Sequence, residues 1–180
     1  MSILEIDNFI PEKVCKGICE AFDESQEGKG EREYIRGKDL ECIRLDMRSM
    51  ANQKAQSKWI DYTKSIAKSM KDGFRKYSAM IGSKESIRFR PEPPHVHRYD
   101  PEFGFHNSTI FNDKRLLSCI FYLNDTIKGE TIFEVDGKQK KIKPKMGKAI
   151  FFPATKEYKF KDTSGKKYMK YVVKGHIIKA

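Results

Sequence analysis

The chain has 180 residues, 38% of them hydrophobic, which is enough to form the core of one folded domain. Its formal net charge is +11, and the excess lies in residues 137–180, where fourteen lysines stand against two acidic residues. The first residues are acidic rather than basic and no apolar run is long enough to cross a bilayer, so we expect an intracellular or virion-associated protein without a signal peptide or a membrane partner.

The N-terminal part alternates between strand and helix signals. Residues 3–10 predict a short strand, and Pro11 then stands at a favoured first position of a helix. A second strand is predicted at 43–47, where apolar and charged residues alternate. From Asn52 to Gly82 the apolar residues step by three and four, which predicts one long helix packed on a sheet through Ala55, Trp59, Tyr62, Ile66, Met70, Phe74, Tyr77 and Ile81.

The C-terminal part reads as a series of short strands separated by Gly, Pro, Asn and Asp. Alternation in His95-Val96-His97-Arg98-Tyr99 places His95, His97 and Tyr99 on one face of a strand. The predicted strands are 86–90, 95–99, 119–123, 130–135 and 149–152. We therefore expect a single domain over 1–180, with strands and supporting helices in 1–85 and a β core in 86–180.

Four motifs follow one another in this β core. They are Tyr122-Leu123-Asn124-Asp125, Gly129-Glu130-Thr131-Ile132-Phe133, the run from Ile142 to Pro153, and Gly165-Lys166-Lys167-Tyr168. The series resembles the core of the prolyl-4-hydroxylase-like 2-oxoglutarate/iron(II) dioxygenases and is similar to their compact phage-encoded members. The resemblance implies a mainly β (α+β) fold, a double-stranded β-helix or jelly roll with N-terminal supporting helices, which carries an iron triad and a 2-oxoglutarate pocket.

The metal ligands that the resemblance implies are a His-x-Asp or His-x-Glu pair on one strand and a distal histidine on a later one. The nearest pair, His106-Asn107-Ser108, has a serine where the carboxylate is required, so His106 is the only candidate ligand there. A second alignment counts from Tyr99 by the spacing that the family uses. It puts Ser108 or Thr109 at the histidine position and Ile110 or Phe111 at the carboxylate position. Glu157 or Tyr158 stands where the distal histidine belongs.

Two cosubstrate-binding residues are implied by the same resemblance. Tyr99 corresponds to a tyrosine that lines the 2-oxoglutarate pocket, and Lys167 to the basic residue that pairs with the far carboxylate of 2-oxoglutarate. His176 is expected to face opposite to Lys167, away from that pocket. An unconventional metal site stays open as an alternative, with ligands drawn from His95, His97, His106, Asp100, Glu102, Asp113 and Glu157.

The leading hypothesis is a protein that has lost catalysis and binds no cofactor. Its lysine-rich segment then serves as a binding or assembly surface for an acidic protein or a nucleic acid, through Lys141, Lys143 and Lys145, as in a phage structural or host-directed protein. One alternative is an active hydroxylase that uses iron(II) and 2-oxoglutarate with unconventional ligands. Another is a non-specific nucleic-acid-binding protein, because lysines without arginine suit phosphate attraction more than base reading.

Overall fold

The structure is a computed structural model that describes residues 2–24, 31–35, 38–44, 57–83, 87–99, 105–108, 112–163, 165 and 167–180. Side chains are described in the same ranges except 31–44, 57–58 and 105–108.

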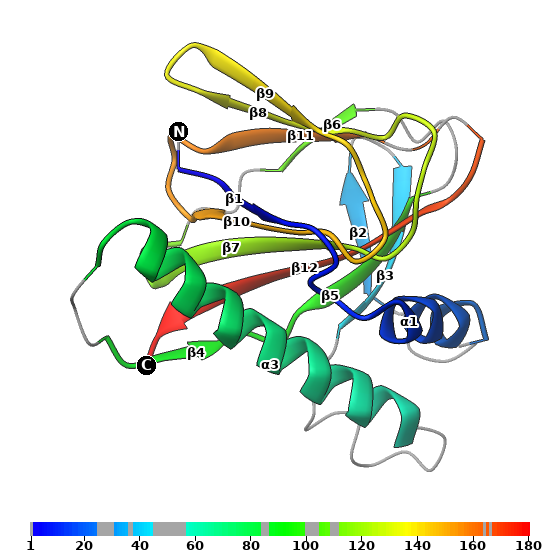
Figure 1. The fold of residues 1–180 in the computed structure, drawn as a ribbon. Coiled ribbons are helices and arrows are strands. Elements are labelled where there is room, and N and C mark those ends of the chain that lie inside the picture. The colour runs from blue at the N-terminus through cyan, green and yellow to red at the C-terminus, as the bar shows by residue number, and fades with distance from the viewer. Residues whose placement is uncertain are drawn as a thin grey trace.

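The described strands form two antiparallel sheets (Figure 1). The larger sheet has the order β1-β10-β7-β12-β5-β3-β2, and β4 pairs with the end of β12. Its strands are β1 (Leu4–Ile6), β2 (Glu31–Ile35), β3 (Lys38–Arg44), β4 (Phe89–Pro91), β5 (His95–Tyr99), β7 (Arg115–Tyr122), β10 (Ala149–Pro153) and β12 (Lys170–Lys179). The smaller sheet, with the order β6-β11-β8-β9, consists of β6 (Phe105–Ser108), β8 (Thr131–Val135), β9 (Lys138–Ile142) and β11 (Lys159–Thr163).

The two sheets face each other as the two halves of a double-stranded β-helix, which confirms the predicted fold class. Strand alternation fills the space between them with one apolar cluster. Phe133, Ile142 and Phe160 reach it from the smaller sheet, and the larger sheet contributes Tyr99, Ile120, Tyr122, Ile150, Phe152 and Val172. This space between the sheets is where the resemblance places the catalytic site.

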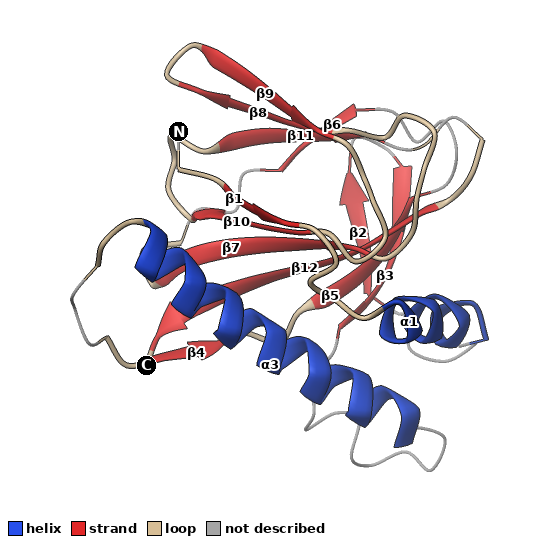
Figure 2. Ribbon diagram, viewed as in Figure 1, coloured by secondary structure: helices blue, strands red, loops and turns tan. Residues whose placement is uncertain are grey.

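Two helices cover the outer face of the larger sheet (Figures 1 and 2). They are α1 (Glu12–Glu24) and α3 (Ser57–Met80), and the predicted stripe of α3 packs on the sheet through Trp59, Ile66, Met70 and Tyr77. The prediction is wrong for Ile81, because this residue follows the end of the helix and is 51% exposed, and Ala55 lies outside the described residues. At Gly73 the helix comes so close to β10 that an added Cβ would lie 1.8 Å from the ring carbon Cζ of Phe151. The helix is followed by Gly82, whose φ of 68° suits the left-handed conformation that ends helices.

Several element boundaries differ from the predicted ones. β1 is only three residues long, because the chain turns at Asn8 (φ 53°) and the amides of Phe9 and Ile10 then donate to the carbonyl of Gly147. β3 ends at Arg44, and the rest of the strand predicted at 43–47 lies outside the described residues. β7 starts at Arg115, four residues before the predicted strand.

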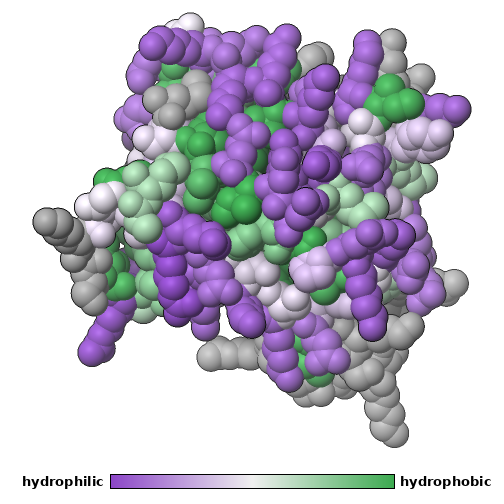
Figure 3. Space-filling view, in the orientation of Figure 1, coloured by the Kyte–Doolittle hydropathy of each residue, from purple (hydrophilic) through white to green (hydrophobic). Residues whose placement is uncertain are grey.

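Neither of the two described helices is long and apolar enough to span a membrane. Hydrophilic side chains cover most of the face shown in Figure 3, with apolar residues visible in small areas between them.

Candidate functional site

A buried ion cluster lies between the two sheets. Asp162 on β11 and Lys170 on β12 are fully buried, and Lys174 is 8% exposed. The ammonium of Lys170 contacts Oδ1 of Asp162, and Nζ of Lys174 lies 3.2 Å from Oδ2. The hydroxyl of Thr131 donates to Oδ1 of Asp162 at 3.0 Å, and the hydroxyl of Tyr122 donates to Thr131 at 2.6 Å. One carboxylate thus receives two cations and one hydroxyl.

The hydrogen bonds of Lys170 identify it as an ammonium ion. Besides Asp162, its Nζ donates to the carbonyl oxygens of Gly129 (2.8 Å) and Thr163 (3.1 Å), so three acceptors take its three N–H groups. Burial lowers the pKa of Lys170, and the negative charge of Asp162 opposes that shift. The pKa of Tyr122 is well above its usual value, chiefly because of burial and then because of Asp162, so its hydroxyl stays a neutral donor.

Tyr99 lies beside this cluster. It stands opposite Lys170 in the β5–β12 register, and its ring centroid is 5.6 Å from Nζ of Lys170 and 5.3 Å from Nζ of Lys174. Both ammonium groups also lie near a second ring, that of Tyr122 for Lys170 and that of Phe160 for Lys174. These cation–π contacts partly replace the water that burial removes from the lysines.

The structure does not bring Lys167 to Tyr99. The Lys167 side chain is exposed, and its ammonium lies 5.5 Å from the ring centroid of its neighbour Tyr168. The lysines beside Tyr99 are Lys170 and Lys174, which sequence reasoning missed. A usable signal was the spacing of Lys170 and Lys174 within an apolar strand, because residues four apart on a strand share one face.

An aromatic side chain occupies the position opposite the expected first metal ligands. In the β6–β11 register Ser108 stands opposite Phe160, and His106 stands opposite Asp162. Phe160 packs against Phe133 and Phe152, with ring centroids 5.4 Å apart in both pairs. The side chains of His106 and Ser108 lie outside the described part, as do Thr109, Ile110 and Phe111.

The other candidate ligands are spread over the fold. Glu157 is exposed, and the ring of the half-buried Tyr158 stacks on Phe152 while its hydroxyl accepts a hydrogen bond from the amide of Ser2. His95 and His97 do share a face with Tyr99, as predicted, with centroids 6.0 and 6.2 Å apart along the strand. Asp113 is in an exposed turn, and Asp100 and Glu102 lie outside the described residues. Within the part of the chain that the structure describes, no three His, Cys, Asp or Glu residues are grouped so as to hold a metal.

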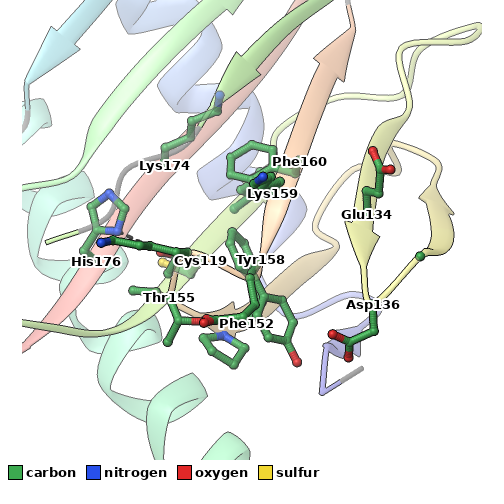
Figure 4. Close-up of a pocket in the computed structure, with 17 residues that line it drawn as sticks. Cys119, Glu134, Asp136, Phe152, Thr155, Tyr158, Lys159, Phe160, Lys174 and His176 are labelled. Carbon is green, nitrogen blue, oxygen red and sulfur yellow. Dashed lines mark hydrogen bonds between the residues drawn. The ribbon is translucent and has the colours of Figure 1, made fainter. Parts of the chain in front are cut away.

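A cavity of about 700 Å³ opens between the sheets next to the ion cluster. Figure 4 shows Lys174 and His176 on one side of it, the aromatic rings of Phe152, Tyr158 and Phe160 in the middle, and Glu134 and Asp136 on the other side. The expectation that His176 faces away from the pocket is therefore wrong. β12 begins at Lys170, and the alternation counted from there puts Lys170, Lys174 and His176 on the inner face.

Ser118 and His176 form a hydrogen-bonded pair in the cavity wall, with 3.0 Å between Oγ and Nδ1. Burial lowers the pKa of His176 to about 3, and the positive charges of Arg115, His95 and Lys174 contribute further. The imidazole is therefore neutral at pH 7, but it is too weak a base to activate the serine for nucleophilic attack. The pair acts as a structural hydrogen bond.

The described residues do not fit iron(II) and 2-oxoglutarate in the arrangement that the resemblance implies. The position opposite the expected ligand strand is apolar at Phe160, and the buried lysines beside Tyr99 are bound to a carboxylate of the chain itself. An iron site needs anionic or imidazole ligands, and a dicarboxylate needs a cation that can receive it.

The arrangement of the two sheets and the flanking helices matches solved structures over the whole chain. A prolyl-4-hydroxylase from Pseudomonas putida superposes with a TM-score of 0.67 at 19% identity, covering 99% of this chain and 93% of the other. The fold is that of a prolyl-4-hydroxylase.

Other prolyl hydroxylases match equally well. The viral collagen prolyl hydroxylase of Paramecium bursaria Chlorella virus-1 gives a TM-score of 0.68 at 18% identity, covering 100% of this chain and 90% of that one. A Trichoplax adhaerens prolyl hydroxylase in complex with a hypoxia-inducible-factor peptide gives 0.70 at 16% identity, with coverage of 99% and 84%. No protein-family model and no curated protein matches the sequence. At sequence identities of 16–19%, the similarity to these prolyl hydroxylases shows a shared fold and does not extend to their activity.

Proposed function

We propose that this chain is a non-catalytic protein built on the prolyl-4-hydroxylase fold, and that it serves as a binding or assembly module for an acidic partner. The observation that carries the proposal is the carboxylate of Asp162, which is bound by Lys170 and Lys174 in the interior beside Tyr99. Asp162 is part of the same chain as Lys170 and Lys174 and is therefore always within their reach. A free dicarboxylate would have to come from solution and displace Asp162 from these lysines.

The smaller sheet supports the conclusion that the chain lacks a metal site of the expected kind. Ser108 stands opposite Phe160 in register, and the expected distal-ligand position holds the exposed Glu157 or Tyr158, whose ring stacks on Phe152. A phenyl ring offers no lone pair to iron(II). The loss of both the metal ligands and the cosubstrate-binding cation leaves the scaffold without the parts that hydroxylation requires.

The surface supplies the binding half of the proposal. Residues 137–180 hold fourteen lysines, no arginine and two acidic residues, so this quarter is strongly cationic while the rest of the chain is near neutral. Lys141, Lys143 and Lys145 are all exposed, in and after β9. We favour an acidic protein, for example in a phage particle or in its host, over a nucleic acid, because arginine is the residue that most often reads bases and is absent here.

The proposal that the chain is non-catalytic is tested with protein purified without chelators. We expect sub-stoichiometric iron by elemental analysis, and no succinate when iron(II), ascorbate and 2-oxoglutarate are supplied with or without proline-containing peptides. The Pseudomonas putida enzyme serves as a positive control in the same assay. Stoichiometric iron together with 2-oxoglutarate turnover would refute the proposal and favour an active hydroxylase with unconventional ligands.

The binding half is tested by charge reversal at Lys141, Lys143 and Lys145, with polyglutamate and an oligodeoxythymidine as probes across a salt series. The matched control reverses three exposed lysines of α3, Lys64, Lys68 and Lys71, and so makes the same change in net charge. We expect the β9 triple variant to lose polyglutamate binding and the α3 variant to retain it. Equal losses would mean that only net charge matters, and tighter, salt-steep binding of the oligonucleotide would favour a nucleic-acid-binding function.

A further inference from the structure

Three exposed apolar side chains gather on two neighbouring loops at one end of the β-helix. Ile127 is 57% exposed, Tyr168 is 50% exposed and Met169 is 39% exposed. The loop between β7 and β8 carries the first, and the loop between β11 and β12 carries the other two. Large apolar side chains that are exposed singly are ordinary on a protein surface, but a group of them is characteristic of an interaction site.

The two loops are in direct contact. An added Cβ at Gly165 would lie 3.3 Å from Cβ of Thr126, 3.7 Å from the carbonyl oxygen of Ile127 and 2.7 Å from that of Tyr168. The absence of a side chain at Gly165 is therefore what lets the loops pack together. Ile127 and Tyr168 therefore stand on adjoining loops.

Side-chain hydrogen bonds hold the loops in place from beneath. The amide group of Asn124 donates to the carbonyl of Met169 at 2.7 Å and accepts from the amide of Tyr171 at 2.9 Å. From the interior, the ammonium of Lys170 holds the carbonyls of Gly129 and Thr163, one at the end of each loop. An apolar surface that is fixed before binding loses little conformational entropy when a partner covers it.

Exposed lysines stand in and beside the two loops, together with the exposed carboxylate of Asp125. Lys128 and Lys167 are exposed within the same two loops. The loop at 143–148, which carries the exposed Lys143 and Lys145, is attached beside them, because the carboxylate of Asp125 accepts the amide of Met146 at 2.8 Å. An apolar centre with a cationic rim is complementary to an acidic segment that carries apolar side chains.

Two of the three apolar side chains have a neighbouring side chain beside them. The ammonium of Lys167 lies 5.5 Å from the ring centroid of Tyr168, and the hydroxyl of Tyr171 is 3.7 Å from the sulfur of Met169. Ile127 and Met169 lack the flat rings on which bases stack.

We propose that Ile127, Tyr168 and Met169, with Lys128 and Lys167, form the docking surface for an acidic protein segment that packs apolar side chains over the two loops. This inference rests on the proposed function only for the acidic character of the partner. The apolar group would give the complex its specificity, and the lysines would accelerate and orient the encounter.

The test uses the full chain and a short synthetic peptide of Glu and Asp with Leu and Phe at every third or fourth position, titrated by fluorescence anisotropy. An all-glutamate peptide of equal charge is the reference. We expect the amphipathic peptide to bind more tightly, and Ile127→Ser with Tyr168→Ser to weaken it at least about tenfold, equivalent to about 1.4 kcal/mol. Ile127→Ser alone is the second variant should the double variant fail to fold, and it is expected to weaken binding in the same direction.

The matched control is Met80→Ser with Ile81→Ser, which removes two apolar side chains of similar exposure, 47% and 51%, at the end of α3. This control should bind the amphipathic peptide as the wild type does. Equal affinity for the two peptides, or equal binding by the loop variant and the wild type, would overturn the docking surface. Retention on phosphatidylserine vesicles or on oligodeoxythymidine that is lost in the loop variant would assign the surface to another partner class. None of these results bears on 2-oxoglutarate turnover, so the two proposals fail separately.

Discussion

Phe160 on β11 stands directly opposite Ser108 on β6, and its ring is packed against Phe133 and Phe152. The strand position that faces the expected ligand strand has thus become part of the apolar core between the sheets. The neighbour of Ser108 on the adjacent strand is therefore an apolar ring held on both sides by other aromatic rings.

Phe160→His should therefore reduce the free energy of unfolding by about 2–4 kcal/mol, because it shortens a core side chain and buries an imidazole among aromatic rings. Urea denaturation followed by intrinsic fluorescence measures the change. The control is Tyr158→His, at a half-buried position on the cavity wall, which should cost less than half as much. Equal stability of the two variants would mean that Phe160 is not a packed core residue.

Asp162→Asn should be strongly destabilising, although asparagine and aspartate have nearly the same volume. It leaves Lys170 buried with no anion, and the loss of one partner of a buried ion pair costs about 3–5 kcal/mol. Lys174→Met should cost much less, because Asp162 then still pairs with Lys170. Urea denaturation at pH 7 compares the two variants. If both were as stable as the wild type, the cluster would make no net contribution to folding.

Periodicity in the sequence predicted the long helix, several strands and the common face of His95, His97 and Tyr99, because these depend on local alternation. The resemblance supplied the fold class, a double-stranded β-helix with N-terminal supporting helices. The ion cluster was beyond such reasoning, since Lys170 and Lys174 are two of fourteen lysines in the segment and only the start and register of β12 decide which of them point inward. The same starting point of β12 reversed the expected direction of His176.

His176 should make the protein less stable in mild acid. Its folded pKa of about 3 is below its ordinary value of 6.5, so the unfolded chain binds the extra proton between these values. Stability from this group is fully present above about pH 6.5 and is lost as the pH falls, by up to about 1.4 kcal/mol per unit. Urea titrations of wild type and His176→Gln at pH 7 and pH 5 isolate the effect, because all other groups are shared. Parallel losses in the two proteins would contradict the assignment.

Gly73→Ala should destabilise the protein although alanine is the better helix former. The helical preference favours alanine by about 1 kcal/mol, but the new Cβ would fall 1.8 Å from a ring carbon of Phe151. Forcing such an overlap costs about 1–3 kcal/mol, so we expect a net loss in thermal or urea unfolding. Adding Phe151→Leu to Gly73→Ala should recover part of the loss. A more stable single variant would mean that the helix can move away from β10.

Two buried lysines share Asp162, and this arrangement affects how the chain could evolve. If an ancestor of this chain was a working hydroxylase, the return path would have to remove Asp162 while Lys170 and Lys174 are both buried, or remove a lysine that also holds the carbonyls of Gly129 and Thr163. Loss of Lys174 leaves Asp162 paired with Lys170, but loss of Asp162 leaves two buried cations without an anion and loss of Lys170 leaves two carbonyls unbound. Natural proteins have only about 5–15 kcal/mol of stability to lose, so the Asp162–Lys170 pair is the part of the cluster that single substitutions would remove least easily.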